Sequence, residues 1–427
     1  MKFILSIFKL KSRQLNLLLL ISSLCAQSIF SQNIITTTTY LNSTNESYQV
    51  RTDKDKLSFL NEYNFNLPLI KGAQIRSETK DFLLKKQEYS LRIKPNSLRA
   101  ISNQKKVYRN KMERIEIQNQ LNFNKELKKR YLLLIDYLYT KDLIKLYEEK
   151  YVQIKDKITV LSQTIYDINF DVNDLIDTEE ELIAIESKLT NLKEDRFNQL
   201  YLIRQFLNFK GDSVNFDFND LINAERIIEM SIIKKPTFED LSISLQKVKL
   251  NTLESEMSLN TAKSNQLIDY FQAKYNSSKS FIFEEDFSAG IGINLPFFGG
   301  TRQKKGKYYF EKLSAESKLI SIKRDVQDEQ KLMLNEFKSA ITNYQDLKKQ
   351  IANSNVKSII NIYKNMDGAS PLIVLKLNIL QNRKKIKILK SQHNLFKAYI
   401  KTLDSKGVLY QKPLKNYISL DWKLLIP

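Results

Sequence analysis

The chain of 427 residues carries one ordered pattern twice, and this duplication limits the folds that it can adopt. Residues 87–95 alternate in polarity and end in Pro95, and residues 288–296 do the same and end in Pro296, about 200 positions later. In each copy a long proline-free segment follows, then a turn, and then a second long segment that ends in Lys-Gly. The pattern predicts an α+β fold built from a tandem-duplicated strand-and-long-helical-hairpin unit.

Composition indicates a folded protein without thiol chemistry. Hydrophobic residues make up 42% of the chain, which is enough for a sizeable core. The single cysteine, Cys25, lies in the N-terminal leader, so the rest of the sequence offers no disulfide and no thiolate metal site. The net charge of +20 is spread over 68 Lys and Arg interleaved with 48 Asp and Glu, which indicates solvated helix faces; a nucleic-acid partner is the alternative.

The first 31 residues have the order of a secretory signal peptide. Basic residues come first, an uncharged and mostly apolar run fills positions 15–26, and small or polar residues follow. This run is shorter than the roughly 20 residues that a helix needs to cross a bilayer. We expect cleavage after Ser31, which makes Gln32 the first mature residue; cleavage after Ala26 and lipid attachment at Cys25 are the alternatives.

The strand-like segments separate apolar from polar side chains. Residues 287–295 place apolar side chains at odd positions and small or polar ones at even positions, and residues 89–94 repeat this alternation. A strand with one face toward lipid and one toward a wet lumen alternates in this way, but so does a half-buried strand of a soluble sheet. The predicted lumen-facing residues are Arg92, Lys94, Ser288, Gly290, Gly292 and Asn294.

The long segments are predicted to be helices that supercoil. Between Ile144 and Ile165, apolar residues step alternately by three and four, which is the 3.5-residue period of coiled-coil packing. We expect one helix from about residue 97 to 165, a turn at 169–173 and a return helix. In the second copy, Asp367 and Gly368 form the turn, and Pro371 opens the return helix as a first-turn proline.

The segment from Gly292 to Arg302, which leads into a long charged helix, resembles the strand-to-helix junction of the TolC family of outer-membrane efflux and secretion ducts. Residues 368–407 resemble that family's second turn and return helix. The resemblance implies a homotrimer with four strands per protomer in one 12-stranded transmembrane β-barrel, continued by a periplasmic α-helical coiled-coil barrel. It also implies a periplasmic adaptor protein and an inner-membrane pump as partners, contact with outer-membrane lipid, and no nucleic acid.

These patterns divide the chain into four parts. We expect a signal peptide at 1–31, a first repeat at 32–211 (strands about 71–95, hairpin about 97–209) and a C-terminal tail at 409–427. The second repeat, 212–408, contains a helix at about 237–266, strands at about 268–297 and a hairpin at about 302–406. Residues 33–66 are rich in Thr and Asn and do not read as the helix that the family places ahead of its first strand.

Two further groups of site residues follow from the resemblance. The tips of the hairpins are expected to dock the adaptor, and the strand-helix junctions to turn the chain. Acidic residues near the first tip, among them Asp177 and Glu179, are either helix caps or part of an acidic gate. The tip residues are Asn169, Phe170, Asp171, Val172, Asp174, Asp367, Gly368 and Ala369; the junction residues are Pro95, Pro296, Gly299 and Gly300.

No catalytic, metal or cofactor site is predicted. The only histidine, His393, occupies an apolar position of the last helix, where packing or a hydrogen bond between helices explains it. Gly299-Gly300 lacks the Gly-Lys-Ser/Thr ending of a phosphate-binding loop. The expected function is a passive, non-enzymatic export duct in the outer membrane; a basic structural coiled-coil protein that binds a membrane surface or nucleic acid is the alternative.

Overall fold

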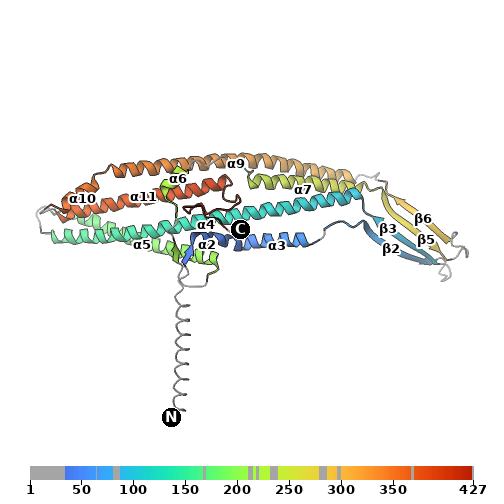
Figure 1. The fold of residues 1–427 in the computed structure, drawn as a ribbon, viewed down its shortest axis with the longest axis horizontal. Helices are drawn as coiled ribbons and strands as arrows, with labels where there is room; N and C mark the ends of the chain where they lie inside the picture. The colour runs from blue at the N-terminus through green and yellow to red at the C-terminus, as the bar shows by residue number, and fades with distance from the viewer. Residues whose placement is uncertain are drawn as a thin grey trace, which may run out of the picture.

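A computed structural model describes residues 34–63, 65–79, 87–166, 170–209, 215–217, 221–230, 239–277, 286–295, 300–366 and 370–425. Within these residues the long helices lie side by side along one axis, and a small sheet projects from one end (Figure 1). The helical hairpins turn at the opposite end, and the chain finishes near the middle.

The main elements of the first repeat are one short helix, two strands and a long hairpin. Its helix α3 is Tyr48–Glu62, its strands are β2, Ile70–Thr79, and β3, Gln87–Pro95, and its hairpin consists of α4, Leu98–Gln163, and α5, Val172–Leu207. The 66 residues of α4 correspond to about 100 Å of helix. The helix begins where the side chain of Ser97 accepts a hydrogen bond from the backbone N–H of Ala100.

The second repeat has the same order but a broken outgoing arm. Its helix α7 is Leu241–Ser264, its strands are β5, Ile268–Asn276, and β6, Phe287–Ile293, and its helices are α9, Gly300–Ala352, α10, Val356–Lys364, and α11, Pro371–Ser405. Pro371 occupies the first turn of α11, as predicted. The break after Ala352 was not predicted, because the sequence there contains neither glycine nor proline.

Both repeats contribute to one antiparallel sheet of order β2-β3-β5-β6. The pairings show how the copies correspond: Ile70 lies opposite Pro95, and Ile268 lies opposite Ile293. The offset is therefore 268 − 70 = 198 residues, so Pro95 corresponds to Ile293. The match between Pro95 and Pro296 is wrong by three positions, because Pro95 is the last residue of β3, whereas β6 ends at Ile293, three residues before Pro296.

Short elements surround the middle of the hairpins. Strand β1, Ile34–Thr36, pairs in parallel with β4, Asn215–Asp217. The other short elements are α2, Thr37–Asn42, the 3₁₀ helix η1, Ser43–Glu46, and α6, Ala224–Glu229.

The expectation that residues 33–66 form little helix was wrong. Thr and Asn are densest at residues 36–46, and even this stretch contains α2 and η1, while α3 covers 48–62 and contains good helix formers such as Lys56 and Leu57. Asp53 of α3 is buried and accepts a hydrogen bond of 2.7 Å from Asn122 of α4. This contact with α4 adds tertiary stabilisation that local composition does not reveal.

The largest hydrophobic cluster joins the hairpins to the C-terminal tail at mid-length. Leu409 and Ile418 of the tail are buried together with residues of α4, α9 and α11. The hydroxyl of the buried Tyr131 donates to the carbonyl of Lys415 at 3.0 Å and accepts from the N–H of Tyr417 at 3.1 Å. The tail therefore holds the two hairpins together.

A second cluster follows the predicted 3.5-residue seam toward the hairpin turns. Ile154 of α4 is buried with Ile185 of α5 and Ile379 of α11. Between these two clusters, His393 Nε2 lies 2.7 Å from Asp136 Oδ1, and its ring stacks on Tyr139. The predicted role of His393 in packing and hydrogen bonding between helices is confirmed.

Candidate functional site

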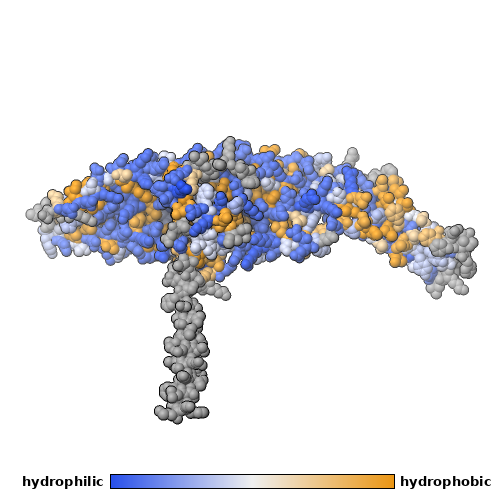
Figure 2. Space-filling view, viewed as in Figure 1, coloured by the Kyte–Doolittle hydropathy of each residue, from blue (hydrophilic) through white to orange (hydrophobic). Residues whose placement is uncertain are grey.

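One face of the sheet is apolar across all four strands. Ile75, Leu91, Ala273 and Ala289 lie opposite one another in a single row, and cross-strand neighbours share a face. Ile75 is 84% exposed in this row, and Ile291 in the adjacent row is 62% exposed. Figure 2 shows the hydrophobic residues gathered over this end of the molecule. The row on one side adds Tyr89, Tyr275 and Phe287 to this face. The row on the other side adds Ile93, Phe271 and Ile291.

The opposite face of the sheet is polar. Gln74, Arg92, Gln272 and Gly290 form its central row, and Lys94 lies opposite Gly72 in the row nearer the helices. The register thus places Arg92, Lys94, Ser288, Gly290 and Gly292 on one face. Asn294 lies just beyond β6. Polar residues of β2 and β5 also lie on this face but are not among the predicted lumen-facing residues, although residues 270–276 alternate in the same way. They are Gln74, Arg76, Tyr270, Gln272 and Lys274.

An aromatic ring on the polar face occupies the space beside Gly292. A Cβ atom at this position would lie 2.3 Å from Tyr270 Cε1, which is far inside van der Waals contact. The guanidinium of Arg92 lies 4.2 Å from the centroid of the same ring, and its Nη2 donates to Gln272 Oε1 at 3.0 Å. Tyr270 therefore covers Gly292 and positions Arg92 by a cation–π interaction.

The strand-helix junctions repeat one backbone contact. After Pro95, the N–H of Asn96 donates to the carbonyl of Leu69 at 2.7 Å, and the N–H of Asn294 donates to that of Leu267 at the same distance. These contacts fix the point at which each repeat leaves the sheet. Gly300 begins α9, while Pro296 and Gly299 lie outside the described residues.

At the first hairpin tip, Asp171 caps helix α5. Its carboxylate accepts a hydrogen bond of 3.0 Å from the N–H of Asn173, and Val172, the first residue of the helix, is 55% exposed. The cap alternative for Asp171 is confirmed. Phe170 precedes the cap and is half-buried; Asn169, Asp367, Gly368 and Ala369 lie outside the described residues.

Asp174 is the centre of an ion-pair network that joins three helices near the tips. Lys157 of α4 lies 2.7 Å from Asp174 Oδ1, and Lys376 of α11 lies 2.7 Å from Oδ2. The buried Lys157 also donates to Thr178 Oγ1 at 2.8 Å. Burial raises the pKa of the Asp174 carboxyl, but the hydrogen bonds from the two lysines outweigh burial and hold the pKa below its ordinary value. Asp174 therefore stabilises the tips as a bridging anion.

One level further from the tips, Glu181 repeats this arrangement. It pairs with Lys150 of α4 at 2.6 Å and with Arg383 of α11 at 2.7 Å. Two carboxylates of α5 thus connect the first hairpin to the second, and both are engaged by cations of the same protomer.

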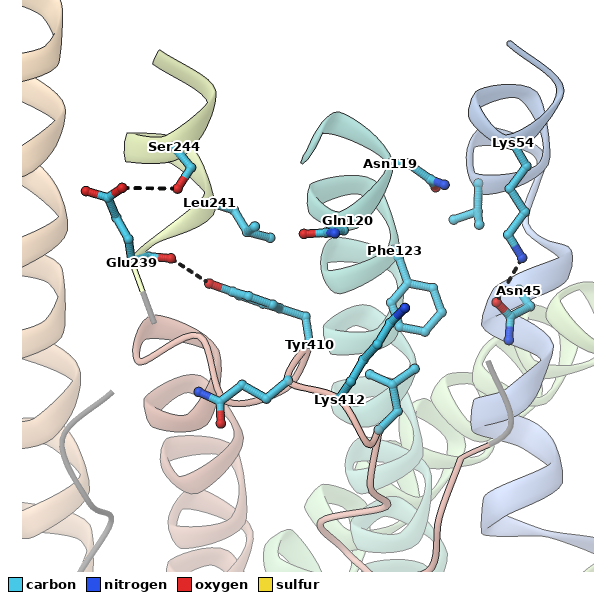
Figure 3. Close-up of a pocket in the computed structure, with 13 residues that line it drawn as sticks. Asn45, Lys54, Asn119, Gln120, Phe123, Glu239, Leu241, Ser244, Tyr410 and Lys412 are labelled. Atoms are coloured by element: carbon cyan, nitrogen blue, oxygen red, sulfur yellow. Dashed lines mark hydrogen bonds between the residues drawn. The ribbon is translucent and has the colours of Figure 1, made fainter. Parts of the chain in front are cut away.

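A cavity of about 560 Å³ lies at mid-length between α3, α4, α7 and the tail (Figure 3). Some of its polar groups pair with one another: Lys54 donates to Asn45 at 3.3 Å, and the hydroxyl of Tyr410 donates to the carbonyl of Glu239 at 3.4 Å. The side-chain oxygen of Asn119, which also lines the cavity, is buried without a hydrogen-bond partner. In the part of the chain that the structure describes, no group of three or more metal-binding side chains occurs. We assign no chemistry to this cavity.

The comparisons with known proteins identify the fold. No family model matches the sequence, and no curated protein matches it. Among solved structures, the open-state MtrE outer-membrane channel of Neisseria gonorrhoeae is similar, with 10% identity, a TM-score of 0.64 and coverage of 87% of this chain and 88% of that one. VceC of Vibrio cholerae shows 8% identity and a TM-score of 0.59 over 87% and 96% of the two chains. The CmeC channel of Campylobacter jejuni shows 12% identity and a TM-score of 0.58 over 87% and 84%.

The chain therefore has the fold of outer-membrane channel subunits. The resemblance to the TolC family that the sequence indicated is confirmed at the level of the fold. These similar structures are channels rather than enzymes. None of the described helices is long and apolar enough to cross a membrane.

Proposed function

We propose that this chain is the outer-membrane channel component of a tripartite efflux or type I secretion system. It acts as a passive duct that extends from the outer membrane into the periplasm, and it is not an enzyme. A periplasmic adaptor and an inner-membrane pump deliver the substrate and supply the energy. The fold shared with outer-membrane channels supports this proposal.

The observation that carries the proposal is the two-faced sheet. Its apolar face is exposed across β2, β3, β5 and β6, while its opposite face is polar. Large exposed apolar surfaces mark membrane or protein contacts, and this pattern matches lipid on one side and water on the other. A coiled-coil protein that binds a surface or nucleic acid has no use for such a sheet, which disfavours the alternative.

Oligomerisation follows from the small number of strands. Within the described residues the sheet ends at β2 on one side and at β6 on the other, and outer-membrane barrels need eight strands or more. Three copies joined edge to edge supply twelve strands and remove the exposed edges. In this trimer Arg92, Lys94, Ser288, Gly290, Gly292 and Asn294 line the lumen.

The hairpin tips are proposed to dock the adaptor. Exposed apolar side chains lie near them on both hairpins, including Tyr166 and Val172 on the first and Ile362 and Met366 on the second. The proposed docking residues are Asn169, Phe170, Asp171, Val172, Asp174, Asp367, Gly368 and Ala369.

Single-cysteine labelling of β6 tests the proposal. In a Cys25→Ser background, cells carrying Ser288→Cys or Gly290→Cys should react with a polar thiol reagent, whereas those carrying Ala289→Cys or Ile291→Cys should be shielded by lipid. Gly290 tolerates the change because no atom lies within 4 Å of an added Cβ, whereas Gly292 is unsuitable because Tyr270 covers it. Equal labelling of all four positions would identify a soluble sheet and contradict the duct.

A further inference from the structure

The polar face of the sheet carries an excess of positive charge. Four cations and two carboxylates lie on this face, which leaves two positive charges per protomer. Bulge positions Lys71 and Asp269 add one charge of each sign and cancel. The charged residues of the face are Arg76, Glu78, Glu88, Arg92, Lys94 and Lys274.

Ion pairing divides these cations into two groups. Arg76 pairs with Glu78 at 3.1 Å, and Lys274 pairs with Glu88 at 2.6 Å. Both carboxylates are therefore neutralised by cations, and both ion pairs lie toward the end of the sheet that is away from the helices. Among the described residues, Arg92 and Lys94 have no carboxylate within salt-bridge distance. The partners of Arg92, Gln272 and Tyr270, are neutral and leave its charge uncompensated. The excess charge therefore lies in the half of the sheet nearer the helices.

Open space lies on the same face as both unpaired cations. Gly72 faces Lys94 across the strands, Gly290 lies in the row of Arg92 beyond Gln272, and no atom lies within 4 Å of a Cβ built at either glycine. These glycines leave room for a solute on the polar face. Tyr270, itself accommodated by Gly292, fixes the position of Arg92, so the positive charge is preorganised.

We infer that the duct prefers anions, with Arg92 and Lys94 as its specificity-determining residues. The inference rests on the proposed trimer, in which three copies place six uncompensated cations in two adjacent rows on the side of the sheet where the helical tunnel meets it. Rings of Arg and Lys favour anions in pores, and confined charge of one sign concentrates counter-ions. The favoured substrates carry carboxylate, phosphate or sulfate groups, and cationic compounds are disfavoured.

Reversal-potential measurements in planar bilayers test the inference with the purified full-length mature protein. In a KCl gradient, the wild-type channel should pass chloride in preference to potassium. Arg92→Gln/Lys94→Gln should lose this preference. The matched control, Arg76→Gln/Glu78→Gln, removes two charges from the same face without changing its net charge and should keep the preference. Lys94→Glu provides a second variant if the double variant does not assemble, because it leaves the stacking of Arg92 on Tyr270 intact. This variant should also shift selectivity toward potassium.

The outcomes separate this inference from the proposed function. A wild-type channel that conducts without preferring chloride, or variants that retain the wild-type preference, overturns the role of Arg92 and Lys94 and leaves the duct intact. Protein that reaches the bilayer but forms no conducting assembly overturns the proposed duct, and the inference fails with it.

Discussion

Replacing Asp174 with Asn should loosen the hairpin tips, because it removes the anion that joins α4, α5 and α11. The main cost comes from Lys157, whose side chain is 11% exposed and loses its carboxylate partner, so that only neutral acceptors such as Thr178 remain to it. A hydrogen bond to a charged group contributes about 1.5 to 3 kcal/mol. Lys376 is 50% exposed, so its ion pair contributes roughly 0 to 1 kcal/mol. We expect Asp174→Asn to cost about 2 to 3 kcal/mol of local stability, nearly all of it through Lys157.

Amide hydrogen exchange of peptides covering residues 155–180 measures this loss. A cost of 2 to 3 kcal/mol corresponds to exchange that is roughly 30- to 150-fold faster. Lys376→Gln should accelerate exchange less than about tenfold, because the pair is exposed. Asp177→Asn, a change at an exposed carboxylate three residues away, is the matched control and should have little effect. Equal effects of Asp174→Asn and Lys376→Gln would refute the reasoning that the buried Lys157 dominates.

The remaining predictions concern acid, the sheet and docking. Because the folded pKa of Asp174 is depressed, the stability that its carboxylate contributes is present above the unfolded pKa of about 3.9 and is lost as pH falls through the folded pKa. The amide exchange rate of the tips, corrected for the intrinsic rate, should therefore stay constant from about pH 7 to 5 and rise below about pH 4. Asp174→Asn should not show this rise. Gly292→Val should cost about 1 to 3 kcal/mol by overpacking Tyr270 and lower the melting temperature of the oligomer, and Tyr270→Ala should relieve the loss. Val172→Glu should change stability by less than about 0.5 kcal/mol, because the side chain is exposed. It should nevertheless abolish export while the amount of trimer recovered stays at the wild-type level. A proportional loss of export and trimer would show that the tip is merely structural.

Strand alternation was sufficient to separate the two faces of the sheet but not to align the repeats. The match of Pro95 with Pro296 makes Tyr89 correspond to Gly290. This pairs a residue of the apolar face with a residue of the predicted lumen face. The observed offset of 198 pairs Tyr89 with Phe287, which preserves the faces. The alternation itself therefore excludes an odd offset such as 201, while the value of 198 comes from the strand pairing.

Contacts between distant elements could not be predicted from local patterns. The network of Asp174, Lys157 and Lys376 requires the packing of three helices, and the sequence showed only an acidic first turn. Tyr270 over Gly292 depends on strand register across β5 and β6. In contrast, the cap at Asp171 and the long helix α4 follow from local signals, namely a carboxylate at a helix start and a proline-free 3.5-residue seam.

Native mass spectrometry of protein extracted from the outer-membrane fraction tests the central claim most directly. One spectrum reports both the number of copies and the mass of each chain. The account predicts three copies of a chain that begins near Gln32, because removal of the leader and closure of twelve strands are both required for a duct. A monomer with residues 1–31 intact, recovered in the soluble fraction, would contradict it.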